Sequence, residues 1–253
     1  MRLQPPRRVL LIQLRRLGDV VISTALLEHL RQAFPGAELD YLVGAAAAPL
    51  LAGHPAIHER IVFDPNRTLR MWGEIRARKF DWVVDLQGSL RTALLSRASG
   101  ARARLGWRIG AWRVFYTRTH TRRGPVEYVA RERARLLERA GVQVTGGRPR
   151  IYLSDDERTR GERDARSAGA VPDVARVGML LSTREPAKDW AIDNFGGVAR
   201  ALVRDGVLPL IFQAPGDEAL TARMRAMAPG VVVLPVLDLR RFLGVLSTCR
   251  LFV

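Results

Sequence analysis

Asp19 is the first residue in the chain whose type and position could support catalysis. Gly18 and Asp19 follow Arg15 and Arg16 directly after an apolar segment, which is typical of a buried strand that turns into a helix. At such a helix start a carboxylate can cap the helix or complement its dipole, while the glycine makes the turn. It can also remain ionised and accept a proton from an attacking hydroxyl. The spacing alone favours the capping role.

A second group of polar residues lies between a predicted strand and a predicted helix near residue 185. Ser182 and Thr183 supply hydroxyl groups and Lys188 supplies a cation. A diphosphate leaving group needs such groups, because negative charge grows on it as its bond breaks. The alternative is a solvated turn in which Trp190 packs against its neighbours. Only Lys79 and Lys188 are lysines in this arginine-rich chain, which weakly favours a functional role for Lys188.

Two further strand ends carry polar residues. Asp217 could bind ribose hydroxyls, as acidic residues do in nucleotide-binding folds, or it could cap the following helix. Gln87 and Arg91 follow the segment WVVD in the same way, and a simple turn is the alternative there.

The familiar phosphate and metal motifs are absent from the sequence. It contains no GxGxxG, no GxxxxGK[ST] and no HExxH. The histidines form no pair at helical i, i+4 spacing, so we expect surface or loop positions for them and no metal site. They are His29, His54, His58 and His120.

Short apolar segments alternate with amphipathic ones along the whole chain. The predicted strands are residues 9–14, 39–43, 61–63, 82–85, 177–181, 207–212, 231–234 and a last one from 251. The predicted helices are residues 19–33, 68–79, 90–98, one opened by Gly124-Pro125 and running to 140, one opened by a capping box at Ser154, 193–203, 217–227 and 239–246. This alternation predicts an α/β protein with parallel sheets in two Rossmann-like halves, residues 1–150 and 151–253. Ligands of such sheets bind at the carboxyl ends of the strands.

Composition narrows the possible partners. The 253 residues are 47% hydrophobic and 26% charged, which is typical of a globular protein. The net charge is +16, and residues 60–135 hold 18 basic and 6 acidic residues, which is +12 of that excess. Such a field attracts nucleic acid, phosphorylated lipid or an acidic membrane face. An arginine-rich coding bias is the alternative explanation.

Cysteine usage and hydropathy bear on the compartment. Cys249 is the single cysteine, so an internal disulfide and a thiolate zinc cluster are both excluded, and a reducing cytoplasm is expected. The first apolar segment is short and lacks a cleavage site behind it. Residues 43–53, the longest weakly polar stretch, fall far short of the roughly 20 residues of a membrane span.

Together these segments resemble glycosyltransferase family nine, the ADP-heptose:lipopolysaccharide heptosyltransferases. The resemblance rests on the opening VLLIQLRRLGDVVISTALLEHLRQAFPGAELDYLV, on FDWVVDLQGSLRTALLSRASGARARLGW, on PAKDW and on APGDE, in the right order and spacing. It implies a GT-B fold, with the acceptor on the N-terminal domain and the nucleotide sugar on the C-terminal one. It further implies inverting, metal-independent transfer of heptose from ADP-heptose to a phosphorylated lipid A–core acceptor. No cofactor and no nucleic-acid partner are expected, and the protein is expected to be a monomer, peripheral at the cytoplasmic face of the inner membrane.

The resemblance also assigns roles to individual residues. Asp19 matches the family's catalytic base, and Lys188 matches the lysine that contacts the diphosphate. Ser182 and Thr183 lie where hydroxyls meet the phosphates, Asp217 matches the acidic ribose contact and Leu237 falls near the adenine pocket. On the acceptor side the expected residues are Gly18, Gln87 and Arg91.

One departure concerns the C-terminal end of the sequence. The family's Asp-x-Gly-x-x-His segment is expected after the strand that begins at Leu251, and the sequence ends at Val253. A fragment and a natural truncation both fit, and a helix N-terminus would be missing beneath the diphosphate. From these 253 residues alone we therefore expect a loose C-terminal half, weak ADP binding and no transfer. The rival hypotheses are an inactive remnant and a basic nucleic-acid-binding α/β protein, whose binding would weaken steeply with salt.

Overall fold

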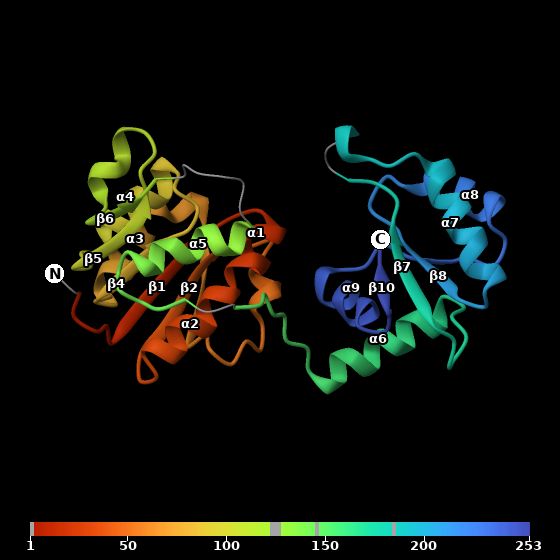
Figure 1. Ribbon diagram of the computed structural model, residues 1–253, viewed down its shortest axis with the longest axis horizontal. Coiled ribbons are helices and arrows are strands. Elements are labelled where there is room, and N and C mark those ends of the chain that lie inside the picture. Colours follow the sequence, from red (N-terminus) through yellow and green to blue (C-terminus); the bar gives the residue numbers. More distant parts are fainter. Residues whose placement is uncertain (1–2, 122–127, 145–146, 184–185) are drawn as a thin grey trace. The chain divides into compact units, whose positions relative to one another are not determined.

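The protein is built from two α/β units, each with a parallel sheet (Figure 1). The computed structural model describes residues 3–121, 128–144, 147–183 and 186–253. Unit 1 is Met1–Tyr152 and unit 2 is Leu153–Val253. Each unit has its own sheet and its own apolar core.

Unit 1 contains a six-stranded parallel sheet in the order β3-β2-β1-β4-β5-β6. Its strands are β1 (Arg8–Gln13), β2 (Glu38–Gly44), β3 (Glu59–Phe63), β4 (Trp82–Asp85), β5 (Ala103–Trp107) and β6 (Arg118–His120). The chain order reverses between β1 and β4, which lie side by side with Ile12 opposite Asp85. At such a reversal the loops after the two strands diverge and leave a crevice for a ligand.

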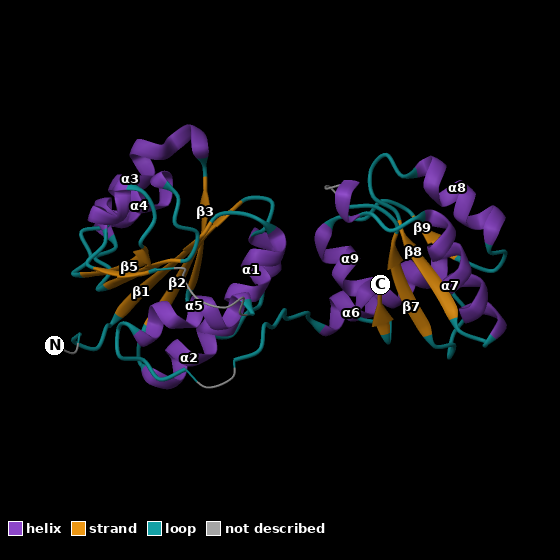
Figure 2. Cartoon of the chain, turned by 45° about the horizontal axis from the view of Figure 1, so that its top comes forward, coloured by secondary structure: helices purple, strands orange, loops and turns teal. Residues whose placement is uncertain are grey.

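Helices cover both faces of this sheet. They are α1 (Leu17–Ser23), α2 (Ala25–Ala33), α3 (Thr68–Ala77), α4 (Leu90–Ala98) and α5 (Val129–Glu138), with short 3-10 turns at η1 (Ala48–Leu51), η2 (Pro65–Arg67) and η3 (Ala111–Phe115). Figure 2 shows α3 and α4 on one face and α2 and α5 on the opposite face. Buried side chains of β1 such as Leu10 and Ile12 pack with Met71 and Ile75 of α3.

Unit 2 has the same kind of architecture, with four parallel strands in the order β10-β7-β8-β9. The strands are β7 (Arg176–Leu180), β8 (Leu208–Phe212), β9 (Val232–Leu234) and β10 (Leu251–Phe252). The helices are α6 (Asp155–Ser167), α7 (Ile192–Arg204), α8 (Glu218–Met227) and α9 (Leu239–Leu246), with the 3-10 turn η4 (Pro186–Lys188). One core lies beneath α7 and α8, and a second lies beneath α6 and α9.

Some elements differ from those predicted from the sequence. The single helix expected over residues 19–33 is two helices, α1 and α2, separated at Thr24, whose hydroxyl and amide both donate to the Val21 carbonyl. β5 and β6 were not predicted, because Arg104 and Gly106 interrupt the apolar residues of β5 and because β6 is short and polar. The proposed helix opening at Gly124-Pro125 lies outside the described residues. In the part of the chain that the structure describes, no helix is both long and apolar enough to cross a membrane.

Candidate functional site

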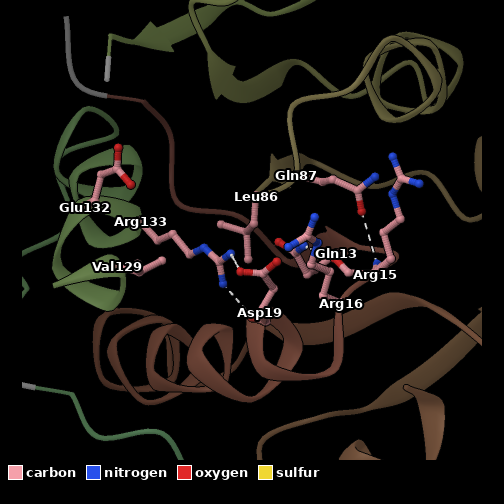
Figure 3. Close-up of a pocket in the computed structure, with 9 residues that line it drawn as sticks. All are labelled: Gln13, Arg15, Arg16, Asp19, Leu86, Gln87, Val129, Glu132 and Arg133. Carbon is pink, nitrogen blue, oxygen red and sulfur yellow. Dashed lines mark hydrogen bonds and ion pairs between the residues drawn. The ribbon is translucent and has the colours of Figure 1, made fainter. Parts of the chain in front are cut away.

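A polar cavity of about 440 Å³ opens at the carboxyl ends of β1 and β4 (Figure 3). It lies where the strand order of unit 1 reverses, and α1 and α5 complete its wall. The lining residues are Gln13, Arg15, Arg16, Asp19, Leu86, Gln87, Val129, Glu132 and Arg133. Arginine and carboxylate side chains therefore dominate the wall, which suits a hydroxylated or phosphorylated ligand.

Asp19 lies in the first turn of α1 and points its carboxylate into this cavity. Asp19 does not cap the helix, because Arg16 occupies the N-cap position and makes no side-chain cap hydrogen bond. The place of Asp19 in the first turn still lets its charge complement the helix dipole, the other structural role expected from the sequence. Asp19 also forms an ion pair with Arg133 of α5, with Nη2 at 2.6 Å from Oδ1. Its side chain is 34% exposed, whereas that of Arg133 is 4% exposed. The Asp19 carboxylate is thus accessible to solvent, while the buried Arg133 guanidinium holds it on the protein side.

Gly18 does not make the tight turn expected from the sequence. It is an exposed residue inside α1 with an ordinary helical φ, because the helix begins at Leu17. A Cβ added at Gly18 would meet nothing within 4 Å. The space above Gly18 is therefore open, and local backbone strain does not require glycine there.

Gln87 connects the two strand ends that form the cavity. Its Oε1 accepts hydrogen bonds from the backbone N–H groups of Leu14 and Arg15, at 3.0 and 3.1 Å. The loop that carries Gln87 is in turn held by Asp85, whose Oδ1 accepts from the N–H groups of Gln87 and Gly88 at 3.0 and 2.9 Å. Gln87 therefore fixes the loop between β1 and Asp19 rather than merely completing a turn.

Asp85 is a buried carboxylate beneath this loop. Tyr116 donates its hydroxyl to Oδ2 at 2.6 Å. Burial raises the pKa of Asp85 above its ordinary value, while the Gly88 N–H and the Tyr116 hydroxyl oppose that rise. Gly88 adopts a φ of +72°, and a Cβ there would lie 2.5 Å from the Trp107 ring. Glycine is therefore required at the tip of the loop.

A second cavity, of about 540 Å³, shares Arg15 and Gln87 with the first. Its other lining residues are Leu14, Gly44, Ala45, Phe63, Pro65, Ser89, Leu90 and Arg91. The Arg91 guanidinium lies over the Phe63 ring, 5.6 Å from its centroid. Asp19, Gln87 and Arg91, which the resemblance places in unit 1, thus line two adjoining cavities.

The donor-side residues expected in unit 2 gather after β7 and β8. Ser182 donates its hydroxyl to Asp217, with both carboxylate oxygens 2.8 Å away. Asp217 is 6% exposed and also accepts from the Ala214 N–H at 3.3 Å. Ser182 and Asp217, which the resemblance assigns to the phosphates and to the ribose, therefore hydrogen-bond to each other.

The other residues expected on the donor side are Thr183, Lys188 and Leu237. The Thr183 N–H donates to Asp189 Oδ1 at 2.7 Å, and Lys188 is exposed at the end of η4. Residues 184–185 of the same loop lie outside the described residues. Leu237 is partly buried and, like Phe242, packs against the core that contains Phe212.

Arg133 was not predicted as a site residue from the sequence. It occupies the buried face of α5 with Ala130, Ala134 and Leu137, so a basic residue on an apolar helix face was the available signal. The expectation for His29 was wrong, because His29 is a buried residue of α2. His54 lies in a loop as expected, although it is buried there. Burial lowers the pKa of both histidines. Among the described residues no cluster of three or more His, Cys, Asp or Glu could hold a metal ion.

The chain resembles known glycosyltransferases in sequence and in fold. A family model, glycosyltransferase family 9 (heptosyltransferase), matches residues 68–253. The lipopolysaccharide core heptosyltransferase OpsX of Haemophilus influenzae is 23% identical over 228 residues, which are 86% of this chain but only 63% of OpsX.

Two solved structures share the fold. A family 9 glycosyl transferase from Veillonella parvula matches 97% of this chain and 74% of its own, with a TM-score of 0.87 at 22% identity. The Escherichia coli heptosyltransferase WaaC with ADP matches 97% of this chain and 80% of its own, with a TM-score of 0.75 at 22% identity. The fold is thus GT-B, with two Rossmann-like units, as the sequence predicted. The chain belongs to glycosyltransferase family 9, the heptosyltransferases.

Proposed function

We propose that this protein transfers heptose from ADP-heptose to the inner core of lipopolysaccharide, with inversion at the transferred carbon. The observation that carries this proposal is the Asp19 carboxylate, which faces the polar cavity at the sheet reversal of unit 1 in a chain of the heptosyltransferase family. WaaC was solved with ADP and with an ADP-heptose analogue, which supports the choice of donor.

Asp19 acts as the general base in this proposal. It accepts the proton of the acceptor hydroxyl as that oxygen bonds to the anomeric carbon of the heptose. The bond from that carbon to the diphosphate breaks at the same time, and ADP leaves with the bonding electrons. A carboxylate that is one-third exposed can meet a substrate hydroxyl and still be held in place by protein. The mechanism requires no metal ion.

Unit 2 supplies the donor site. Lys188 neutralises the charge that develops on the diphosphate, and Thr183 contacts a phosphate oxygen. Asp217 binds the ribose: a carboxylate has about four lone-pair positions, so its bond to Ser182 leaves capacity for a ribose hydroxyl. Leu237 contributes apolar contact for the adenine ring.

Unit 1 supplies the acceptor site. Gln87 and Arg91 line the second cavity beside Asp19, and its arginines suit the phosphates of a lipid A–core acceptor. The basic excess of residues 60–135 would hold the protein at the anionic cytoplasmic face of the inner membrane.

The proposal is tested by Asp19→Asn in the complete protein, with any encoded residues beyond Val253. The amide keeps the shape but cannot accept the proton, so transfer to heptose-deficient lipopolysaccharide should fall about 10²–10⁴-fold. ADP affinity, measured by calorimetry, should stay unchanged. The exposed Glu74→Gln on α3 is the control, since Glu74 pairs only with Arg70 in the described contacts. Turnover of Asp19→Asn within threefold of wild type would refute the assignment.

A second variant tests the donor side. Lys188→Ala should weaken ADP binding and lower turnover further, because a cation beside the diphosphate matters most when negative charge develops. Wild-type kinetics and ADP affinity would refute the role of Lys188. Tight binding of DNA that weakens steeply with salt, together with no ADP binding, would instead favour the nucleic-acid hypothesis.

A further inference from the structure

Arg133 is a buried arginine whose position the fold alone does not explain. It is 3% exposed and lies on the face of α5 that also buries Ala130, Ala134 and Leu137. Arginine is almost never buried unless it is paired. Its Nε–H is buried and finds no hydrogen-bond acceptor among the described residues, which adds to the cost of this placement.

The guanidinium holds Asp19 at two points. Nη2 donates to the Asp19 carboxylate at 2.6 Å, and Nη1 donates to the backbone carbonyl of the same residue (Figure 3). Nη1 also donates to Ser23 Oγ at 2.7 Å, and Ser23 in turn donates to the Asp19 carbonyl at 2.6 Å. The side chain and the backbone of Asp19 are therefore fixed together by residues from two helices.

We infer that Arg133 is a positioning residue for the general base: its planar fork sets the orientation of the Asp19 carboxylate in the cavity. The inference rests on the proposed function, in which Asp19 accepts the acceptor proton. A buried ion pair adds little net stability over well-packed apolar side chains, so stability by itself is a weak reason for an arginine here. Lysine cannot replace the fork, because one ammonium cannot hold the carboxylate and the carbonyl in the same geometry.

Other charged groups also face Asp19. Arg15 and Arg16 line the cavity from the loop after β1, and Glu132 lines it from α5. Beneath the site lies Tyr41 of β2, whose pKa is raised by burial, so it stays neutral near pH 7. Because several charged groups face Asp19, only a comparison of variants isolates the contribution of Arg133.

The test measures the protonation of Asp19 directly, so it does not depend on turnover. Aspartate carboxyl carbons are labelled with ¹³C and titrated by NMR in the wild type, Arg133→Met, Arg133→Lys and Arg131→Met. The Asp19 signal is assigned from its loss in Asp19→Asn. Arg131 is the matched control: it lies on the same helix but is exposed and contacts Glu138 and the Val144 carbonyl.

Arg133→Met should move the midpoint of the Asp19 titration to higher pH, because the cation that favours the ionised form is gone. The acid limb of the pH–kcat/KM profile should move in the same direction. Arg133→Lys should keep the midpoint near that of the wild type. Both variants should lower kcat about 10–100-fold through misorientation of the base, with a small change in KM. Arg131→Met should match the wild type throughout.

The inference and the proposed function fail differently. If Asp19→Asn keeps its turnover, the general-base assignment fails. If Asp19→Asn is inactive but Arg133→Met or, should that variant not fold, Arg133→Lys has wild-type kcat, the positioning role of Arg133 is overturned. A drop in melting temperature with an unchanged Asp19 midpoint and unchanged kcat would reduce Arg133 to a structural tie between α5 and α1.

Discussion

Replacement of Asp85 tests the buried support of the catalytic loop. In the native structure Asp85 accepts hydrogen bonds from the Gln87 and Gly88 N–H groups and from the Tyr116 hydroxyl. Burial and the charge of Asp85 raise the pKa of Tyr116, so its hydroxyl stays protonated and remains a donor. Asp85→Ala removes the acceptor from all three donors.

The expected cost follows from burial. The Gly88 N–H and the Tyr116 hydroxyl belong to buried residues, and each donor left without a partner costs about 1–3 kcal/mol. Removal of a buried polar carboxyl group offsets part of this loss, so we expect unit 1 to lose about 3 kcal/mol. Asp85→Asn keeps a carbonyl for both backbone donors and disturbs only the Tyr116 contact, so it should cost about 1 kcal/mol in acid.

The pH dependence has a definite sign. Because burial raises the folded-state pKa of Asp85, its contribution to stability is complete below its ordinary value of 3.8 and is lost as pH rises through the folded-state value. The amide that replaces the carboxyl group in Asp85→Asn does not titrate. The stability of this variant relative to the wild type should therefore improve as pH rises from acid to neutral.

Urea unfolding followed by tryptophan fluorescence measures this in unit 1, since only Trp190 of the five tryptophans lies in unit 2. Glu74→Gln, an exposed position on α3, is the control and should match the wild type within about 0.5 kcal/mol. An Asp85→Ala variant as stable as wild type would refute the hydrogen-bond argument. An Asp85→Asn variant that loses stability relative to wild type with rising pH would refute the sign of the titration.

Unit 2 offers further predictions. Glu162 binds buried Arg176, which lowers the pKa of Glu162 to about 2, so its contribution is complete above 4.5 and is lost as pH falls towards 2. Glu162→Gln should therefore lower the free energy of unfolding by about 2 kcal/mol at pH 7, in urea unfolding followed by circular dichroism, and a deficit of the same size at pH 2 would contradict this. Gly161→Ala should destabilise unit 2 by about 1–3 kcal/mol, because the added Cβ would lie 2.1 Å from the Gly244 backbone between α6 and α9. Gly197→Ala, where a Cβ on α7 meets open space, should stabilise by about 0.5–1 kcal/mol, and equal melting temperatures for the two alanine variants would contradict the packing argument.

Local sequence patterns predict much of the fold. The limits predicted for β4, α4 and α9 match the structure residue for residue, and the capping box at Ser154 is present with both of its hydrogen bonds. Apolar periodicity, caps and turn residues act within a few positions, so they can be read without knowledge of the rest of the chain. The family, and with it the GT-B fold, followed from the order of these segments.

The geometry of the site was decided by tertiary structure. The ion pair between Asp19 and Arg133 joins residues 114 positions apart, and Ser182 meets Asp217 across 35 positions. The sequence offered Asp19 as a helix cap or a base, and only the packing of α5 against α1 showed that its carboxylate is held by an arginine instead of by its own helix. Contacts between distant segments depend on which strand and helix faces come together, and a local pattern carries no information about that pairing.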